Sequence, residues 1–166
     1  MNVAYWRHKS RKNDHRQMTD IHDELKRIAE GMGLGYYFGD WQSANYHADK
    51  WGANGGTFLL DILPVSGTLH IYRGTEATDE QQCNLAFLQR VPTDVALDTR
   101  GETTAALINV CKNDAEIFFG KISQSGTIEP IHGDVPYTHI IEVMDETYTG
   151  VLYTVPLKPT QGRCIV

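Results

Sequence analysis

Apolar side chains recur at helical spacing in the first part of the chain. The residues concerned are Ile21, Leu25, Ile28 and Met32. Intervals of four, three and four residues place them on one face of a helix. Asp20 can accept hydrogen bonds from the free N–H groups of the first turn, and the glycine at 31 favours an end to the helix. The pattern predicts a helix over residues 20–31.

A second and longer helical pattern lies in the second half of the chain. Its apolar seam consists of Leu107, Cys111, Phe118 and Ile122, joined by Val110, Ala115 and Phe119. We therefore expect a helix at about residues 102–122. Cys111 falls on the apolar side of this helix, which favours a small buried core residue at that position.

The rest of the pattern predicts strands. They are expected at residues 36–38, 57–63, 68–73, 84–91, 127–132, 138–144 and 148–157. The second of these is nearly apolar on both faces, which favours a central position in a sheet. The third alternates Leu69 and Ile71 with polar residues, as a half-buried strand does. Residues 40–50, 64–67 and 74–82 are expected to form a loop, a turn and a polar connection.

The last two strands are expected to form a hairpin around a tight turn at residues 145–147. One face of the final strand carries Val151, Tyr153, Val155 and Leu157. Pro156 has no N–H donor for a neighbouring strand, so it favours a sheet edge at that point. The order of helix, strands, helix and strands predicts an α+β fold. We expect two main helices to pack on a sheet that is largely antiparallel. A mixed sheet, with some parallel strands, is the alternative.

Length and composition narrow the class of protein. The chain has 166 residues, of which 41% are hydrophobic and 22% charged, which is typical of one soluble globular domain. No apolar run approaches the roughly 20 residues of a membrane-spanning helix, and no signal peptide is recognisable. The three cysteines at 83, 111 and 164 include no CxxC pair, so neither a disulfide framework nor a zinc site is expected. A reducing, cytoplasmic compartment is favoured.

Charge is unevenly distributed along the chain. Residues 1–17 have a net charge of +4, because Arg7, Lys9, Arg11, Lys12 and Arg16 stand against Asp14 alone. Residues 18–166 hold ten Lys or Arg against twenty Asp or Glu, a net charge of −10. We interpret 1–17 as a basic N-terminal extension and 18–166 as a single α+β domain. The extension either docks on a partner or precedes a natural start at Met18, and the acidic domain disfavours a nucleic-acid-binding face.

No motif for catalysis, cofactor binding or metal binding is recognisable. The glycines at 31, 33 and 35 follow a helix, whereas a phosphate-binding loop precedes one. The most suggestive metal ligands are His70, His132, Asp134 and His139, but their spacing matches no known pattern. We therefore expect no catalytic residue, no cofactor and no metal ion.

One segment is unusual in composition. Residues 36–51 hold six of the sixteen aromatic side chains, namely Tyr36, Tyr37, Phe38, Trp41, Tyr46 and Trp51. Such a cluster either closes the core of a sheet, stacks on a sugar or base, or contacts a protein partner. The candidate interaction surface consists of Tyr36, Tyr37, Trp41, Tyr46 and Trp51.

Three stretches of sequence carry a resemblance to a known class of proteins. They are the opening at 18–25, the apolar stretch at 84–88, and the closing hairpin at 145–157, in which an acidic turn and Thr-Gly-Val precede an alternating strand. In the order of these stretches, the segment 18–160 resembles the small proteins of tailed-phage and prophage morphogenesis clusters. These proteins form the tail-terminator and head–tail neck class. The aromatic segment and the basic extension have no counterpart in that class.

This resemblance implies a structural protein without catalytic residues. Such proteins form a ring, usually a hexamer, that docks on the end of the tail tube and joins it to the capsid connector. It implies a homo-oligomer that contacts other tail or neck proteins, with no specific nucleic acid and no membrane. The protein would be cytoplasmic until assembled into a virion or phage-like particle. An acidic body can line a channel through which DNA passes without adsorbing.

Two alternatives remain open. A small-ligand-binding or hydrolytic domain would use the aromatic segment with His70 or His132, and it requires a deep pocket where Trp41 or Trp51 meets polar side chains. A monomeric acidic interaction module, of antitoxin or immunity type, would mimic nucleic acid with its surface. The ring-forming hypothesis requires instead an exposed apolar or aromatic patch.

Overall fold

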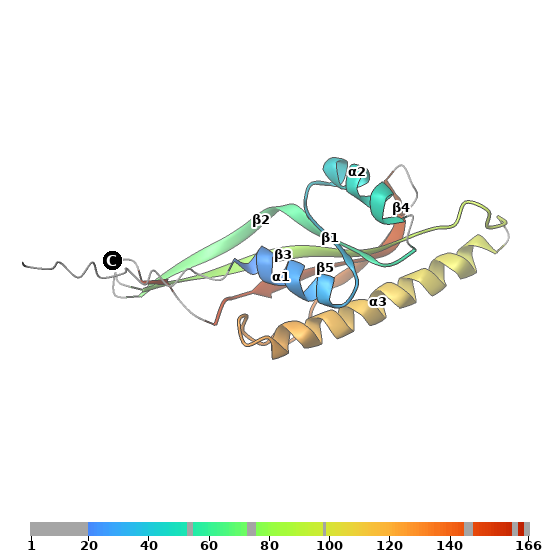
Figure 1. Ribbon diagram of the computed structural model, residues 1–166. Coiled ribbons are helices and arrows are strands. Elements are labelled where there is room, and N and C mark those ends of the chain that lie inside the picture. Colours follow the sequence, from blue (N-terminus) through green and yellow to red (C-terminus); the bar gives the residue numbers. More distant parts are fainter. Residues whose placement is uncertain are drawn as a thin grey trace, which may run out of the picture.

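The computed structural model describes residues 20–52, 55–72, 76–97, 99–144, 148–160 and 163–164, so the basic extension 1–17 and the boundary predicted at Met18 lie outside the described residues. The helices in this part are α1 (Ile21–Gly31), α2 (Trp41–Gly52) and α3 (Arg100–Gln124). The strands are β1 (Gly35–Gly39), β2 (Phe58–Tyr72), β3 (Glu76–Arg90), β4 (Tyr137–Val143), β5 (Tyr148–Leu157) and β6 (Arg163–Cys164) (Figure 1).

The strands form one mixed sheet in the order β1-β2-β3-β5-β4, with β6 paired to β3. β1 and β2 are parallel, and the other pairs are antiparallel. The predicted α+β class with a largely antiparallel sheet is therefore confirmed. The central position predicted for residues 57–63 is also confirmed, because β2 lies between β1 and β3.

Helices cover both faces of the sheet. α1 and α3 lie on one face, where Leu25 and Phe118 join a core with Leu59, Leu85 and Val151. α3 is a long helix that lies alongside the sheet but does not reach the far ends of β2 and β3 (Figure 1). α2 lies on the opposite face, where its Ala44 joins a second, smaller core. The other buried members of that core are Phe58, Leu60, Ile62, Ala86, Leu88 and Tyr148.

α1 begins as the sequence predicts. The Asp20 side chain accepts a hydrogen bond from the backbone N–H of His22 at 2.9 Å, and the buried positions include Ile21, Leu25 and Ile28. The strand predicted at 36–38 is confirmed as β1.

The loop predicted at residues 40–50 is wrong, because these residues form α2. Asp40 Oδ1 accepts a hydrogen bond from the Ser43 backbone N–H at 2.7 Å and satisfies a free donor of the first turn. Trp41, Ala44 and Trp51 then fall at helical spacing and pack on the second core. This combination of an aspartate cap and spaced apolar residues was the available signal.

The turn predicted at 64–67 and the connection predicted at 74–82 are also wrong, because β2 and β3 are each continuous strands of 15 residues. A register shift between Ile62 and Ser66 places three residues of β2 opposite Cys83. This bulge accommodates Pro64, which cannot donate to a neighbouring strand. The polar residues at 76–82 form a strand because β2 provides their backbone partners.

Three smaller differences concern the second half of the chain. On α3, Ile108 is buried in place of the predicted Leu107, and Val110 is 43% exposed. Residues 127–132 are not a strand, since only Ile128 forms an isolated bridge, to Pro159. The predicted helix at 102–122 is confirmed as part of α3.

The predicted strands at 138–144 and 148–157 are confirmed as β4 and β5, while the turn between them at 145–147 lies outside the described residues. The four apolar residues predicted to share a face of the final strand, Val151, Tyr153, Val155 and Leu157, all join the larger core. Pairing of β4 with β5 extends no further than Tyr153, so Pro156 lies at a local edge, as its missing donor requires.

Candidate functional site

The far halves of β2 and β3 extend beyond the rest of the sheet as a two-stranded ribbon (Figure 1). We call residues 66–72 and 76–82 the hairpin arm. β1 pairs with β2 only as far as Ile62, and β5 pairs with β3 only as far as Gln81. At the tip, β6 pairs with Glu76 and Ala77. Within the described part of the chain, no strand other than β3 pairs with β2 in the arm.

The hairpin arm exposes large apolar side chains. Leu69 is 59% exposed, Ile71 61% and Tyr72 50%. Leu69 lies opposite Asp79, and Ile71 lies opposite Ala77. Directly opposed residues share a face of the sheet, and every second residue of β3 lies on the same face, so Ala77 and Asp79 share a face with Cys83 and Leu85 of the larger core. Leu69 and Ile71 are therefore on the face that α1 and α3 cover, which we call the α1/α3 face. The prediction of a half-buried strand, with Leu69 and Ile71 on its buried face, is wrong in this respect, because both side chains are exposed and no described helix reaches that far along the ribbon.

Such a ribbon is a surface suited to a partner. An isolated two-stranded hairpin is at best marginally stable in water, and an open strand edge is a template for pairing with another chain. Burying the exposed part of Leu69 or Ile71 would stabilise a complex by roughly 1–2 kcal/mol per side chain. The hairpin arm is therefore the strongest candidate functional surface in the described structure.

The candidate aromatic surface is divided between the two faces of the sheet. Tyr36 is partly buried against the larger core. Tyr37, Trp41 and Trp51 are partly buried against the second core. Trp51 packs on β1 at Gly35, where an added Cβ would lie 2.6 Å from its Cδ2 atom.

Some aromatic side chains of the segment 36–51 are exposed to solvent. Tyr46 is 66% exposed and lies edge-on to His47. Tyr37 stacks on the same His47 ring, with 4.2 Å between ring centroids. On the other face, Phe38 is 37% exposed and stacks on His22 at 3.9 Å. The five predicted residues thus do not form one surface, and their role as an interaction site stays a prediction.

A buried carboxylate lies at the base of the hairpin arm. Asp61 of β2 is fully buried, and its Oδ2 accepts hydrogen bonds from His22 Nδ1 at 2.5 Å and from the Tyr36 hydroxyl at 3.0 Å. Among the described residues, no donor reaches the other carboxylate oxygen, Oδ1. The cluster ties the first turn of α1 to β1 and β2.

The contacts with Asp61 shift the pKa values of His22 and Tyr36. Burial acts to lower the pKa of His22, but the hydrogen bond and the negative charge of Asp61 outweigh it, so that the pKa of His22 is raised above its ordinary value. Burial, reinforced by the charge of Asp61, holds the pKa of the Tyr36 hydroxyl well above its usual range. Tyr36 therefore remains a donor at any physiological pH.

An open pocket lies beside this cluster. It is lined by Asp20, His22, Asp23, Lys26, Tyr36, Tyr37 and Phe38. Neither Trp41 nor Trp51, which the ligand-binding alternative requires, contributes to it. Its described lining contains no Ser or Cys side chain, so it holds no candidate nucleophile of the usual kind.

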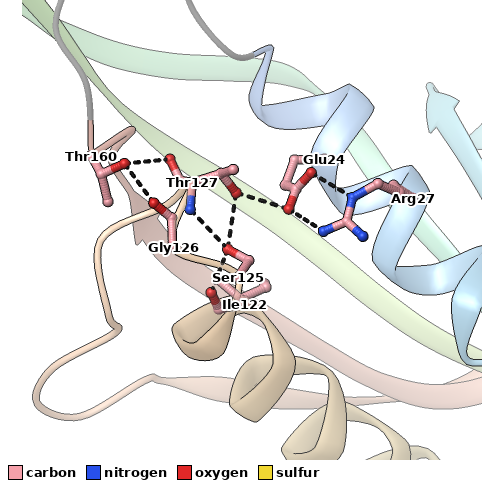
Figure 2. A network of polar contacts seen from close by, with 7 residues as sticks. All are labelled: Glu24, Arg27, Ile122, Ser125, Gly126, Thr127 and Thr160. Atoms are coloured by element: carbon pink, nitrogen blue, oxygen red, sulfur yellow. Dashed lines mark hydrogen bonds and ion pairs between the residues drawn. The ribbon is translucent and has the colours of Figure 1, made fainter.

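A second polar network ties α1 to the end of α3 (Figure 2). Glu24, which is buried, accepts two hydrogen bonds from the Arg27 guanidinium at 2.8 and 2.6 Å and one from the Thr127 hydroxyl at 2.8 Å. The hydrogen bonds from Arg27 hold the pKa of Glu24 below its usual value. The Thr160 hydroxyl donates to the carbonyl of Gly126 at 2.8 Å, which attaches the chain after β5 to the same corner.

The histidines considered as metal ligands are not brought together. His70 lies in the hairpin arm, with its Nε2 3.7 Å from Glu80 Oε2. His139 is on β4 and stacks on Tyr137, while His132 and Asp134 are exposed between α3 and β4. Across the described residues, no three His, Cys, Asp or Glu side chains are grouped so that they could hold a metal ion.

Two of the three cysteines are buried thiols. Cys83 and Cys111 are free and fully buried, and burial raises the pKa of each to about 12. The core position predicted for Cys111 is confirmed. Neither thiol is a nucleophile at neutral pH.

Sequence reasoning missed the two features that the structure brings forward. Asp61 is the only charged residue in the apolar stretch 57–63, which was a signal for a buried polar partner. The neighbouring sequence does not predict the exposure of Leu69 and Ile71, because that exposure depends on how far α1 and α3 extend over the sheet.

Comparison of the chain with protein-family models, with curated proteins and with solved structures finds no match. In the described part of the chain, no helix combines the length and the apolar character that crossing a membrane requires.

Proposed function

We propose that the protein is a structural tail-completion protein, of the tail-terminator or neck class of tailed phages and prophages, whose copies associate into a ring. The observation that carries the proposal is the hairpin arm. A strand pair that exposes Leu69, Ile71 and Tyr72 beyond its own core is typical of a subunit that is completed by another chain. The resemblance of the sequence stretches 18–25, 84–88 and 145–157 to that class supports the same proposal.

The arrangement of the sheet supports a head-to-tail contact. Among the described strands, the edge of β2 that is unpaired in the arm and the unpaired edge of β4 lie on opposite sides of the strand order. β4 also exposes Tyr137, at 53%, and Ile141, at 59%. A contact between two different surfaces repeats from copy to copy, and it closes into a ring when the rotation per copy divides a full turn.

Electron microscopy of the purified full chain tests this proposal. We expect closed rings of one diameter, and we expect them to be lost in the Leu69→Asp/Ile71→Asp variant because two charges would face the buried contact. The control is Ile117→Asp on α3, where the side chain is 52% exposed outside the arm, and it should leave the rings intact. Isolated particles alone, or open filaments, would contradict the proposal.

The ligand-binding or hydrolytic alternative depends on the pocket beside α1. Tyr36, Phe38 and His22 line it, and a stacked ligand would be its natural occupant. The His22 Nδ1 is engaged by the buried Asp61, as in a positioned general base, but the nucleophile that such a base would serve is absent from the described lining. This alternative is therefore weaker than assembly through the arm.

A further inference from the structure

Exposed apolar side chains gather at two strand edges that lie on opposite sides of the described sheet. On β2, beyond the last pair with β1 at Ile62, the arm exposes Leu69 and Ile71. On β4, which ends the strand order, Tyr137 is 53% and Ile141 59% exposed. Among the described strands, no other one exposes two such side chains. Each edge therefore combines apolar side chains with unpaired backbone groups, which is what strand addition between chains uses.

The directions of the strands suit a contact between the two edges in different copies. β4 and β3 are both antiparallel to β5, and β3 is antiparallel to β2, so β4 runs opposite to β2. A neighbouring copy held in the same orientation therefore presents its β4 antiparallel to the β2 edge of the first copy. The alternation of strand directions continues across such a contact.

The faces of the two edges also match. Tyr137 lies opposite Tyr153, whose side chain joins the larger core, so Tyr137 is on the α1/α3 face. Leu69 and Ile71 are on the same face of the arm. Tyr137 of a neighbour in the same orientation therefore comes beside them, and aromatic side chains next to branched apolar ones stabilise paired strands.

The charges near the two edges are opposite in sign. Asp79 lies across from Leu69, and its Oδ2 accepts a hydrogen bond from the neutral Gln81 amide at 2.8 Å. Lys112 of α3 lies over the Tyr137 ring, with Nζ 4.4 Å from the ring centroid. Two arms packed on each other would bring their Asp79 carboxylates together, whereas an arm on the β4 edge brings a carboxylate toward an ammonium group. This complementarity favours the β4 edge as the partner surface.

We infer that the β2 edge of the arm, at residues 66–72, pairs with residues 137–140 of β4 in a second copy of the chain, so that one sheet runs through successive copies. β4 is regular over 137–140, and its register with β5 shifts only beyond Ile140. The inference rests on the proposed function, because it names the contact through which the copies associate.

The levels of the two edges along the sheet constrain the assembly. Tyr137 is level with Leu85 of β3 through Tyr153, whereas Leu69 is level with Asp79, six residues away along β3. Placing Tyr137 beside Leu69 therefore shifts the neighbouring copy by roughly 20 Å along the strands. A closed ring with this stagger needs strands that are tilted to the ring axis, as in a closed barrel.

Mixing two variants that each lack one edge tests the pairing. The arm variant is Leu69→Asp/Ile71→Asp, and the β4 variant is Tyr137→Asp/Ile141→Asp. All four side chains are more than half exposed, so neither variant alters the core. We expect each variant alone to have the mass of one chain in light scattering. Their equimolar mixture should have the mass of two chains and no more, because one intact arm meets one intact β4 edge.

Hydrogen–deuterium exchange in the same mixture locates the contact. Amide exchange should slow by about tenfold or more at residues 66–72 of the β4 variant and at residues 137–140 of the arm variant. The same two segments in the opposite variants are internal controls and should be unchanged. Ile117→Asp, with a charge at a comparably exposed site on α3, should assemble as the unsubstituted chain does.

The inference is overturned if the unsubstituted chain forms rings while the mixture keeps the mass of one chain, or if the protected segments lie elsewhere. The proposed function would then stand. An unsubstituted chain that never exceeds the mass of one copy would remove both. Protection of the two segments within open filaments would support the strand pairing and contradict the ring.

Discussion

A single buried carboxylate organises the base of the hairpin arm. Asp61 is fully buried in β2, and two donors from other elements, His22 and Tyr36, stabilise its charge. Removing a partner from a buried charge generally destabilises a protein more than the pair stabilises it, because the remaining group is left uncompensated. The cluster is therefore expected to control how firmly α1 is held on the sheet.

The raised pKa of His22 predicts a specific pH dependence. A histidine whose pKa is higher in the folded chain than in the unfolded one contributes stability that is complete below about pH 6.5 and is lost as the pH rises through the folded pKa. The difference in free energy of unfolding between the unsubstituted chain and His22→Gln should thus be larger at about pH 5 than at about pH 8.5. Urea denaturation at the two pH values measures it.

His139→Gln is the matched control for this prediction, because that residue is exposed on β4. The difference in free energy of unfolding between the unsubstituted chain and His22→Gln could instead stay constant or grow with pH. That result would show that the Asp61 contact does not favour the protonated ring.

Sequence patterns predicted residues whose role is local. The Asp20 cap and the buried Cys111 follow from neighbours within one helix, and both are found. The Asp61 cluster could not be predicted in the same way, because His22 is 39 residues away from Asp61 in the chain. Only the fold brings the two together.

At the scale of elements, the sequence predicted the helices and strands that carry a periodic apolar pattern. It did not predict the strand segments that consist of polar residues. α1, α3 and β5 each carry a repeating apolar face, and each was predicted. The first half of β3 consists of polar residues that form a strand only because β2 lies beside them. α2 was missed because its aromatic residues suggested a special surface, whereas Trp41 and Trp51 simply pack on the second core.

The centre of the sheet gives a prediction about one element. Gly150 of β5 lies opposite Leu88, and a Cβ at that position would overlap the carbonyl oxygen of Phe87. Gly150→Ala should therefore lower the free energy of unfolding by about 1–3 kcal/mol or more, since the backbone of β3 must move.

Gly120→Ala on α3 is the matched control for Gly150→Ala. An added Cβ meets nothing within 4 Å at Gly120, and alanine is a better helix former. This substitution should raise the free energy of unfolding by about 0.5–1 kcal/mol. Equal effects of the two substitutions in urea denaturation would contradict the close approach of β5 to β3.

At the scale of the whole molecule, the sheet is longer than the helices that cover it. α1 and α3 bury the α1/α3 face near Leu59 and Leu85, while Leu69 and Ile71 remain in water. The fold class could be predicted from the sequence, because it depends on the order of elements. The uncovered arm could not, since it depends on relative lengths in three dimensions.

The central claim is that the hairpin arm joins copies of the chain, and the mass of the protein in solution tests it most directly. Light scattering over rising concentration should show the mass increasing from 18.7 kDa to a constant whole-number multiple of that value. The Leu69→Asp/Ile71→Asp variant should remain at 18.7 kDa, and Ile117→Asp should follow the unsubstituted chain. A mass of one chain at every concentration, or assembly of the Leu69→Asp/Ile71→Asp variant like that of the unsubstituted protein, would contradict the claim.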